Sequence, residues 1–251
     1  MDFELVYTSA DGVVLDLFDG SGGGPFVEVD SLSGFVGEFE DTVVSSPGVP
    51  GGRVDFRDRV VAPLTGSFTL VVPSREAWGV VREVFSTHKY GTLRLTSGGR
   101  MSELSVRLRV SLPSPGVRPR AGERVQVDLV SDGVGGGVWL SRAVSRDFIV
   151  TVTNWGDVPV WPEVVWSGAG GRVVLPSGVG LTLPAVVGEH RLPLARVNAG
   201  RVFGPDGEVD RALSRQVGAV SEMVPVGESR EYQIPEGAAL VWSVGVFDPW
   251  H

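Results

Sequence analysis

The sequence predicts a mainly β protein of two domains, and three observations carry this prediction. Of its 251 residues, 35 are Gly and 17 are Pro, so turns must be frequent. Short runs of alternating apolar and polar residues recur between these turns, most clearly at 104–112, as strands with one buried face require. A flexible segment at 131–137 then separates two series of such runs, which predicts domains at 1–133 and 138–251.

The first domain is predicted to combine strands with a single helix. The expected strands lie at 3–7, 12–18, 26–32, 54–61, 66–72, 104–112 and 125–129. The helix is expected at about 75–87, with Ser74 as its N-cap and Glu76 in its first turn. Its apolar stripe is predicted to cover the sheet.

Two glycine-rich segments of this domain are predicted to be loops. Residues 20–24 resemble a phosphate-binding loop, but no Lys-Ser/Thr pair follows them, which favours a hairpin loop. The Pro-Gly segment 45–52 is expected to project between strands as an arm.

Charge is divided unevenly along the chain. Residues 1–52 contain ten acids and no base, 53–130 contain thirteen bases and seven acids, and 131–251 contain nine bases and thirteen acids. The acidic opening argues against a nucleic-acid-binding arm. It is either a solvated face or a surface that meets the basic segment of a neighbouring copy. The candidate subunit or channel acids are Asp11, Asp16 and Asp19, and the candidate complementary bases are Arg53, Arg57 and Arg59.

The residues needed for catalysis or metal binding are scarce. The chain has no Cys, which excludes disulfides, thiolate metal sites and a Cys nucleophile. Its histidines, His88, His190 and His251, form no metal-binding pair, and the sequence lacks a Gly-x-Ser-x-Gly elbow. The alternating acids in 206–210 could offer oxygens to calcium, but a Pro-Asp-Gly turn explains them without metal. We therefore expect no enzyme activity, no cofactor and no metal.

No segment of the sequence predicts membrane insertion. The opening residues lack the basic and apolar regions of a signal peptide, and no apolar stretch is long enough to cross a bilayer.

The most informative segment is 154–163, Asn-Trp-Gly-Asp-Val-Pro-Val-Trp-Pro-Glu, which follows an alternating apolar run. Asn154, Gly156 and Asp157 are turn formers, and Pro159 and Pro162 are typical of an edge strand. The segment predicts the first turn of a new β domain, with an ordinary sandwich hairpin as the simplest interpretation.

This Asn-x-Gly-Asp turn and Pro-x-x-Pro strand resemble the start of the C-terminal domain of siphophage distal tail proteins, the Dit-like minor tail proteins. The Pro-Gly loop at 47–52, the arginines that precede 66–72, the helix and the Pro-Asp-Gly hairpin at 205–207 follow a similar order. The resemblance implies a split β-barrel-like N-terminal domain with one helix. It also implies a galectin-like or carbohydrate-module-like C-terminal β-sandwich.

The resemblance further implies a structural virion protein. Such proteins form a hexameric ring at the distal tail tip, assembled in the host cytoplasm, which joins the tail tube protein to the tail-tip hub and tape-measure proteins. Receptor-binding proteins attach outside, and DNA only passes through the channel. The excess of Arg, 21 residues against the single Lys89, suggests a GC-rich genome such as that of an actinobacterial phage.

Two other functions stay open at this stage. A carbohydrate-binding module for host cell-wall polysaccharide would use exposed indole rings, and the candidates are Trp155, Trp161, Trp166 and Trp242. The same tryptophans could instead fill the core or a subunit contact. A tail-tube subunit is the third possibility.

Overall fold

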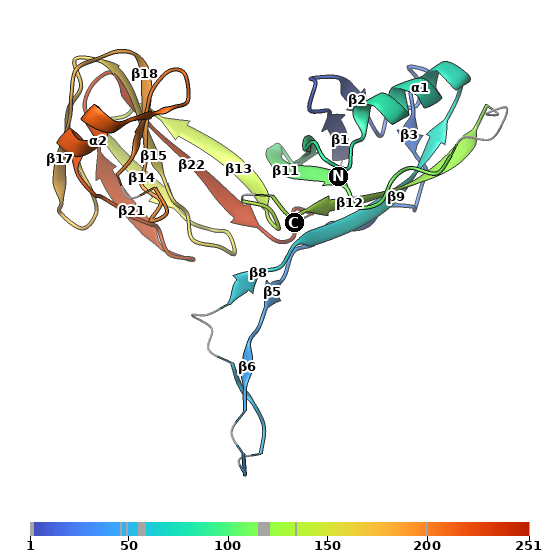
Figure 1. Cartoon of the computed structure of the whole chain (residues 1–251), viewed down its shortest axis with the longest axis horizontal. Helices are drawn as coiled ribbons and strands as arrows, with labels where there is room; N and C mark the ends of the chain where they lie inside the picture. The colour runs from blue at the N-terminus through green and yellow to red at the C-terminus, as the bar shows by residue number, and fades with distance from the viewer. Residues whose placement is uncertain are drawn as a thin grey trace. The chain divides into compact units, whose positions relative to one another are not determined.

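The computed structural model describes residues 3–45, 47–48, 50–54, 59–114, 121–133, 135–198 and 200–250. As predicted, the fold is mainly β, and in these residues the sheets are antiparallel and none closes into a barrel (Figure 1). The chain forms two compact units, Met1–Leu140 with Val246–His251, and Ser141–Gly245. Among the described helices, none is long and apolar enough to cross a membrane.

Unit 1 is built on two linked antiparallel sheets. One has the order β2-β1-β10-β11, and the other joins β12 to β9, which also pairs with β3 and β4. The strands are β1 (Phe3–Thr8), β2 (Val14–Asp16), β3 (Phe26–Val27), β4 (Ser33–Gly34), β9 (Leu64–Val72), β10 (Gly91–Ser97), β11 (Arg100–Leu108) and β12 (Glu123–Ser131). β11 begins and ends four residues earlier than the predicted 104–112, and at its end the N–H of Leu108 donates to Ser86.

Helix α1 (Arg75–Val84) begins where the sequence predicts. The hydroxyl of Ser74 accepts a hydrogen bond from the N–H of Ala77 at 3.1 Å, as an N-cap should. The helix ends three residues before the predicted 87, because Phe85 adopts an extended backbone and stacks on Tyr7 with ring centroids 4.3 Å apart. Its apolar face is buried in the core of unit 1, as predicted.

The described residues of 39–61 form a two-stranded antiparallel ribbon, called here the arm. β5 (Phe39–Glu40) pairs with β8 (Val60–Val61), and β6 (Val43–Val44) pairs with β7 (Arg53–Val54). Among the described strands, none of these four pairs with a third one. The sequence predicted one strand at 54–61, whose middle part, 55–58, lies outside the described residues.

The last residues of the chain return to unit 1. The N–H of Gly37 donates to the carbonyl of Phe247 at 2.9 Å, and the Phe247 ring contacts Phe39 edge-on with centroids 4.8 Å apart. The Trp250 ring contacts Phe3 in the same way at 5.6 Å. These aromatic contacts explain why residues 246–251 group with unit 1, although the sequence assigned 138–251 to one domain.

Unit 2 consists of two antiparallel sheets around one core. The first contains β13 (Trp139–Ser145), β22 (Ala238–Val246), β15 (Glu163–Gly168), β18 (Val186–Pro193), β19 (Val202–Phe203) and β20 (Val209–Asp210), in this order. The second contains β14 (Ile149–Thr153), β21 (Ser229–Gln233), β16 (Gly171–Val174) and β17 (Gly180–Leu183). A short helix, α2 (Arg211–Val217), is capped by Asp210. The arrangement fits a β-sandwich.

Candidate functional site

The turn after β14 is organised by the fully buried side chain of Asn154. Its amide donates to the carbonyls of Val158 and Val224 at 2.9 and 3.0 Å, and its oxygen accepts from the N–H of Gly156 at 3.0 Å. The backbone of Asn154 also bonds to residues 227 and 228. One side chain therefore joins the end of β14 to the segment that leads into β21.

The rest of the predicted motif serves the same structural purpose. A Cβ on Gly156 would lie 2.3 Å from the carbonyl oxygen of Gly245, so only glycine fits against the end of β22. The N–H of Asp157 donates to that same carbonyl at 2.8 Å. Pro159 is exposed and Pro162 is buried, and both precede β15. The prediction of an edge strand is wrong, because β15 lies between β22 and β18.

The four candidate tryptophans have different environments. Trp166 is buried, donates its indole N–H to the carbonyl of Pro184 at 3.0 Å and contacts His190. Trp242 packs against the core of unit 2. Only Trp155 and Trp161 are exposed, by 48% and 37%. A sugar site built on four indole rings is therefore not formed.

The candidate acids of unit 1 are exposed, and each has a local partner. The carboxylate of Asp11 pairs with Lys89 through both oxygens, at 2.9 and 3.1 Å. Asp16 accepts from two backbone N–H groups of the following turn, and Asp19 accepts from the N–H of Ser21 at 2.8 Å. Hydrogen bonding to Ser21 lowers the pKa of Asp19. Asp16 and Asp19 therefore order the turn that follows β2, and Asp11 forms a surface ion pair.

Two of the three candidate bases belong to the described part of the arm. Arg53 is in β7, and Arg57 lies outside the described residues. Arg59 pairs with Asp41 at 2.6 Å and lies over the ring of Phe39, 5.3 Å from its centroid. Arg59 thus pairs with an acid of its own arm.

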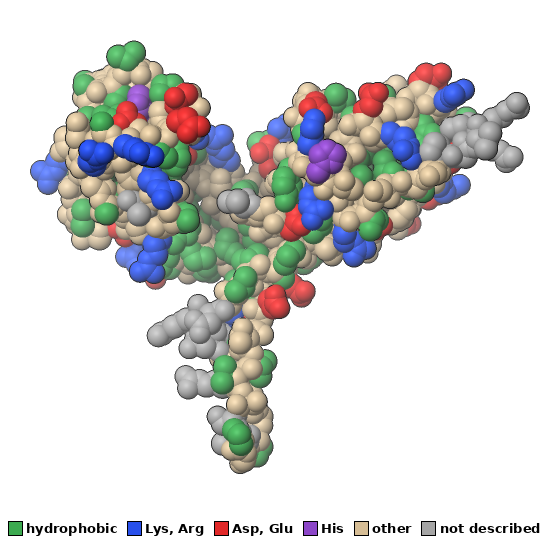
Figure 2. Space-filling model, in the orientation of Figure 1, with side chains coloured by type: hydrophobic (Ala, Val, Ile, Leu, Met, Phe, Trp, Pro, Cys, Tyr) green, Lys and Arg blue, Asp and Glu red, His purple; other side chains and the backbone are tan. Residues whose placement is uncertain are grey.

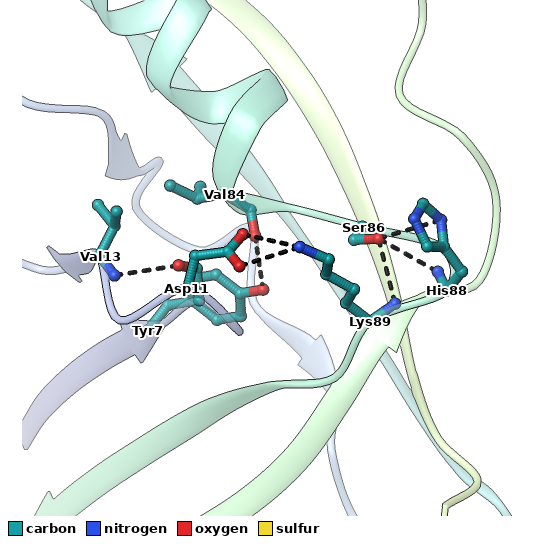
Figure 3. Close-up of polar contacts among 8 residues, drawn as sticks. Tyr7, Asp11, Val13, Val84, Ser86, His88 and Lys89 are labelled. Atoms are coloured by element: carbon teal, nitrogen blue, oxygen red, sulfur yellow. Dashed lines mark hydrogen bonds and ion pairs between the residues drawn. The ribbon is translucent and has the colours of Figure 1, made fainter.

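A serine and a histidine meet after α1, which the sequence did not predict (Figure 3). The Ser86 hydroxyl lies 3.3 Å from Nδ1 of His88, beside a hollow of about 310 Å³ that Lys89 and Asp11 also line. The Ser86 oxygen also accepts the backbone N–H groups of His88 and Lys89, at 3.2 and 3.1 Å. Because its lone pairs are used to close a turn, we interpret this group as a structural turn and not as a nucleophile with its base.

The arm exposes apolar side chains on its surface (Figure 2). Val43, Val44 and Val60 are exposed by 62%, 63% and 62%. An isolated two-stranded ribbon is marginally stable in water, and covering these valines would remove apolar surface from water. The arm is therefore a candidate contact surface.

A second hollow, of about 380 Å³, lies on the outward face of the first sheet of unit 2. It combines basic, acidic and small apolar side chains from β13, β15, β18 and β22, and it is called here the sheet hollow. Its lining comprises Arg142, Val144, Arg146, Glu163, Val165, Glu189, Arg191, Gly204, Pro205, Ala239 and Val241. No sequence pattern predicts this hollow, because its residues come from segments far apart in the chain.

Solved structures of phage proteins have a similar fold. The chain is similar to the SPP1 Dit protein, described as a paradigm of the hub adsorption apparatus in phages that infect Gram-positive bacteria. The TM-score is 0.63 at 10% identity, over 98% of this chain and 99% of that one. It is also similar to a chain of the phage P2 baseplate in its activated conformation with calcium. There the TM-score is 0.58 at 9% identity, over 97% and 98% of the two chains.

These likenesses establish the fold. Each spans nearly the whole length of both chains, so the likeness covers both units of this chain. No protein-family model matches the sequence, and a comparison with curated proteins also finds no match.

Proposed function

We propose that this protein is a structural component of a phage tail tip, in which six copies form a ring. The observation that carries the proposal is the full-length likeness to Dit and baseplate proteins, which includes both units. The predicted Asn154 turn supports it, because the motif that suggested the family from sequence organises the fold of unit 2.

The arm supplies the physical reason for self-association. It is a two-stranded ribbon with three largely exposed valines, and isolated ribbons of this kind are marginally stable in water. A neighbouring copy that covered these valines would remove apolar surface from water. Because the arm and the surface that receives it differ, such contacts run head to tail, and they form a ring when the rotation between neighbouring copies closes.

In this proposal, the ring joins the tail tube protein to the hub and tape-measure proteins at the distal end of the tail. DNA passes through its channel, and receptor-binding proteins dock outside. Asp11, Asp16 and Asp19 are proposed to face the channel, where their negative charge would keep passing DNA from binding.

Electron microscopy of the purified full-length protein, combined with light scattering, tests the proposal. We expect short rings of uniform size. Long tubes would support a tail-tube subunit instead. A protein that stays monomeric at high concentration, and is missing from virus particles, would contradict the ring.

A further inference from the structure

The sheet hollow gathers three exposed arginines. Arg142 and Arg146 come from β13 and the residue after it, and Arg191 comes from β18. Within the described part of the chain, none of the three forms an ion pair or a side-chain hydrogen bond. Each guanidinium group carries five N–H donors, so the hollow presents many donors to a ligand.

Two carboxylates in the same hollow supply acceptors. Glu163 is half-buried on β15, and Glu189 is exposed on β18. Burial raises the pKa of Glu163, although the charges of Arg191 and Arg142 act in the opposite direction. Its carboxylate accepts no hydrogen bond from the other described residues. A half-buried carboxylate without a partner is costly, and a ligand that donates hydrogen bonds would relieve that cost.

The floor between these charged groups is formed by apolar side chains. In the strand register, Glu163 lies opposite Val241, and Val165 lies opposite Ala239 and Arg191. Pro205 also lines the hollow. Small apolar side chains surrounded by a few polar groups are typical of a small-molecule site, and about 380 Å³ is in the usual range of volumes.

We propose that the sheet hollow binds an acidic sugar, a hydroxyl-rich ring that carries one carboxylate or phosphate group. The arginines would bind the acid group, the two glutamates would accept hydrogen bonds from hydroxyl groups, and the C–H face of the ring would cover the apolar floor. Three arginines against two glutamates leave an excess of positive charge, which favours an acidic sugar over a neutral one.

An acidic peptide fits less well. Each of its acidic side chains adds a negative charge beside Glu163 and Glu189, whereas a sugar offers several hydroxyl donors for each acid group. The inference does not depend on the proposed ring, because every residue of the hollow belongs to unit 2 of a single chain.

Isothermal titration calorimetry of the full-length protein tests the proposal with four probes: trigalacturonate, glucose 6-phosphate, maltotriose and hexaglutamate. We expect one of the two acidic sugars to bind at least about tenfold more tightly than maltotriose, because a charge-assisted hydrogen bond is stronger than a neutral one. Binding of trigalacturonate alone assigns a carboxylate, and binding of glucose 6-phosphate alone assigns a phosphate.

Matched variants locate the site. Arg191→Gln and Arg142→Gln should each weaken binding of the acidic sugar about tenfold. Arg211→Gln, an equal charge change on exposed α2 outside the hollow, should leave binding unchanged. The proposal is overturned if neither acidic sugar binds at millimolar concentration, if hexaglutamate binds as tightly, or if Arg211→Gln weakens binding equally. Light scattering of the same samples reports ring formation separately.

Discussion

Replacing the exposed valines of the arm tests whether the arm holds copies together. The variant combines Val43→Thr, Val44→Thr and Val60→Thr. Threonine keeps the β-branched shape that suits strands, so the pairing of β6 with β7 and of β5 with β8 should persist. The variant replaces one methyl group by a hydroxyl group at each of the three positions.

The size of the effect follows from the exposure of these side chains. Each substitution removes about 0.8 kcal/mol of apolar burial and adds about 1–3 kcal/mol for desolvating a hydroxyl group. About three fifths of each valine is free to be covered, which scales the loss to about 1–2 kcal/mol per residue. Three residues give about 3–6 kcal/mol per arm, or an association constant at least roughly 100-fold lower.

Sedimentation velocity across a range of protein concentrations measures this loss. We expect the variant to dissociate at concentrations where the unmodified protein remains assembled, and urea unfolding to show that the monomer is intact. The control combines Val29→Thr, Val187→Thr and Val197→Thr, which are even more exposed, at 84%, 95% and 81%, but lie outside the arm. Equal assembly of the arm variant and the unmodified protein would refute the reasoning, as would equal loss in the control.

Three further predictions concern stability. Asn154→Ala should lower the free energy of unfolding by roughly 2–5 kcal/mol, because it removes three hydrogen bonds and leaves their backbone partners unpaired. Urea unfolding measures this change, and Asn198→Ala serves as a control that should have almost no effect. Gly66→Ala should lower the free energy of unfolding by about 1–3 kcal/mol, because its Cβ would lie 2.4 Å from the Phe35 ring. Gly79→Ala, which has open space around it on α1, should raise the free energy of unfolding by about 0.5–1 kcal/mol. Thermal unfolding that does not shift in opposite directions for the two variants contradicts this prediction. Burial raises the pKa of Tyr7 to about 12, above its value of about 10 in the unfolded chain. The contribution of Tyr7 to the free energy of unfolding is therefore fully present below pH 10 and is lost as the pH rises towards 12. Tyr7→Phe should lower the free energy of unfolding by about 1 kcal/mol at pH 7, because the hydrogen bond to the carbonyl of Val84 is lost. Between pH 10 and 12, urea titrations should show a smaller decrease in the free energy of unfolding for this variant than for the unmodified protein.

Local signals in the sequence were reliable where one side chain determines the backbone. Ser74 fixes the start of α1 through a bond to a residue three positions later, and Asn154 forms its turn with Gly156. The end of α1 was not predicted, because it depends on Phe85 stacking on Tyr7 from a distant strand. In the arm, the sequence predicted the projecting loop and a strand at 54–61 but not β5 or β6, because these strands are two residues long and leave no readable period.

The functional surfaces were harder to predict, because they depend on register. In β15, Val164 and Trp166 face the core while Glu163 and Val165 line the sheet hollow, yet valine occurs on both faces. The sequence alone therefore could not place Trp166 inside. The hollow itself forms only after β13, β22, β15 and β18 are aligned.

The two proposed surfaces share a property that makes them separately testable. The core cluster of unit 1 includes Phe35 and Leu64 but no described residue of the arm between them, and the core of unit 2 includes no residue of the sheet hollow. Both units thus close their apolar cores without these surfaces. Because most destabilising substitutions act through the core, changes in the arm should alter association, and changes in the hollow should alter ligand binding, while each unit stays folded. Loss of one activity with retention of the other would establish two surfaces in one chain.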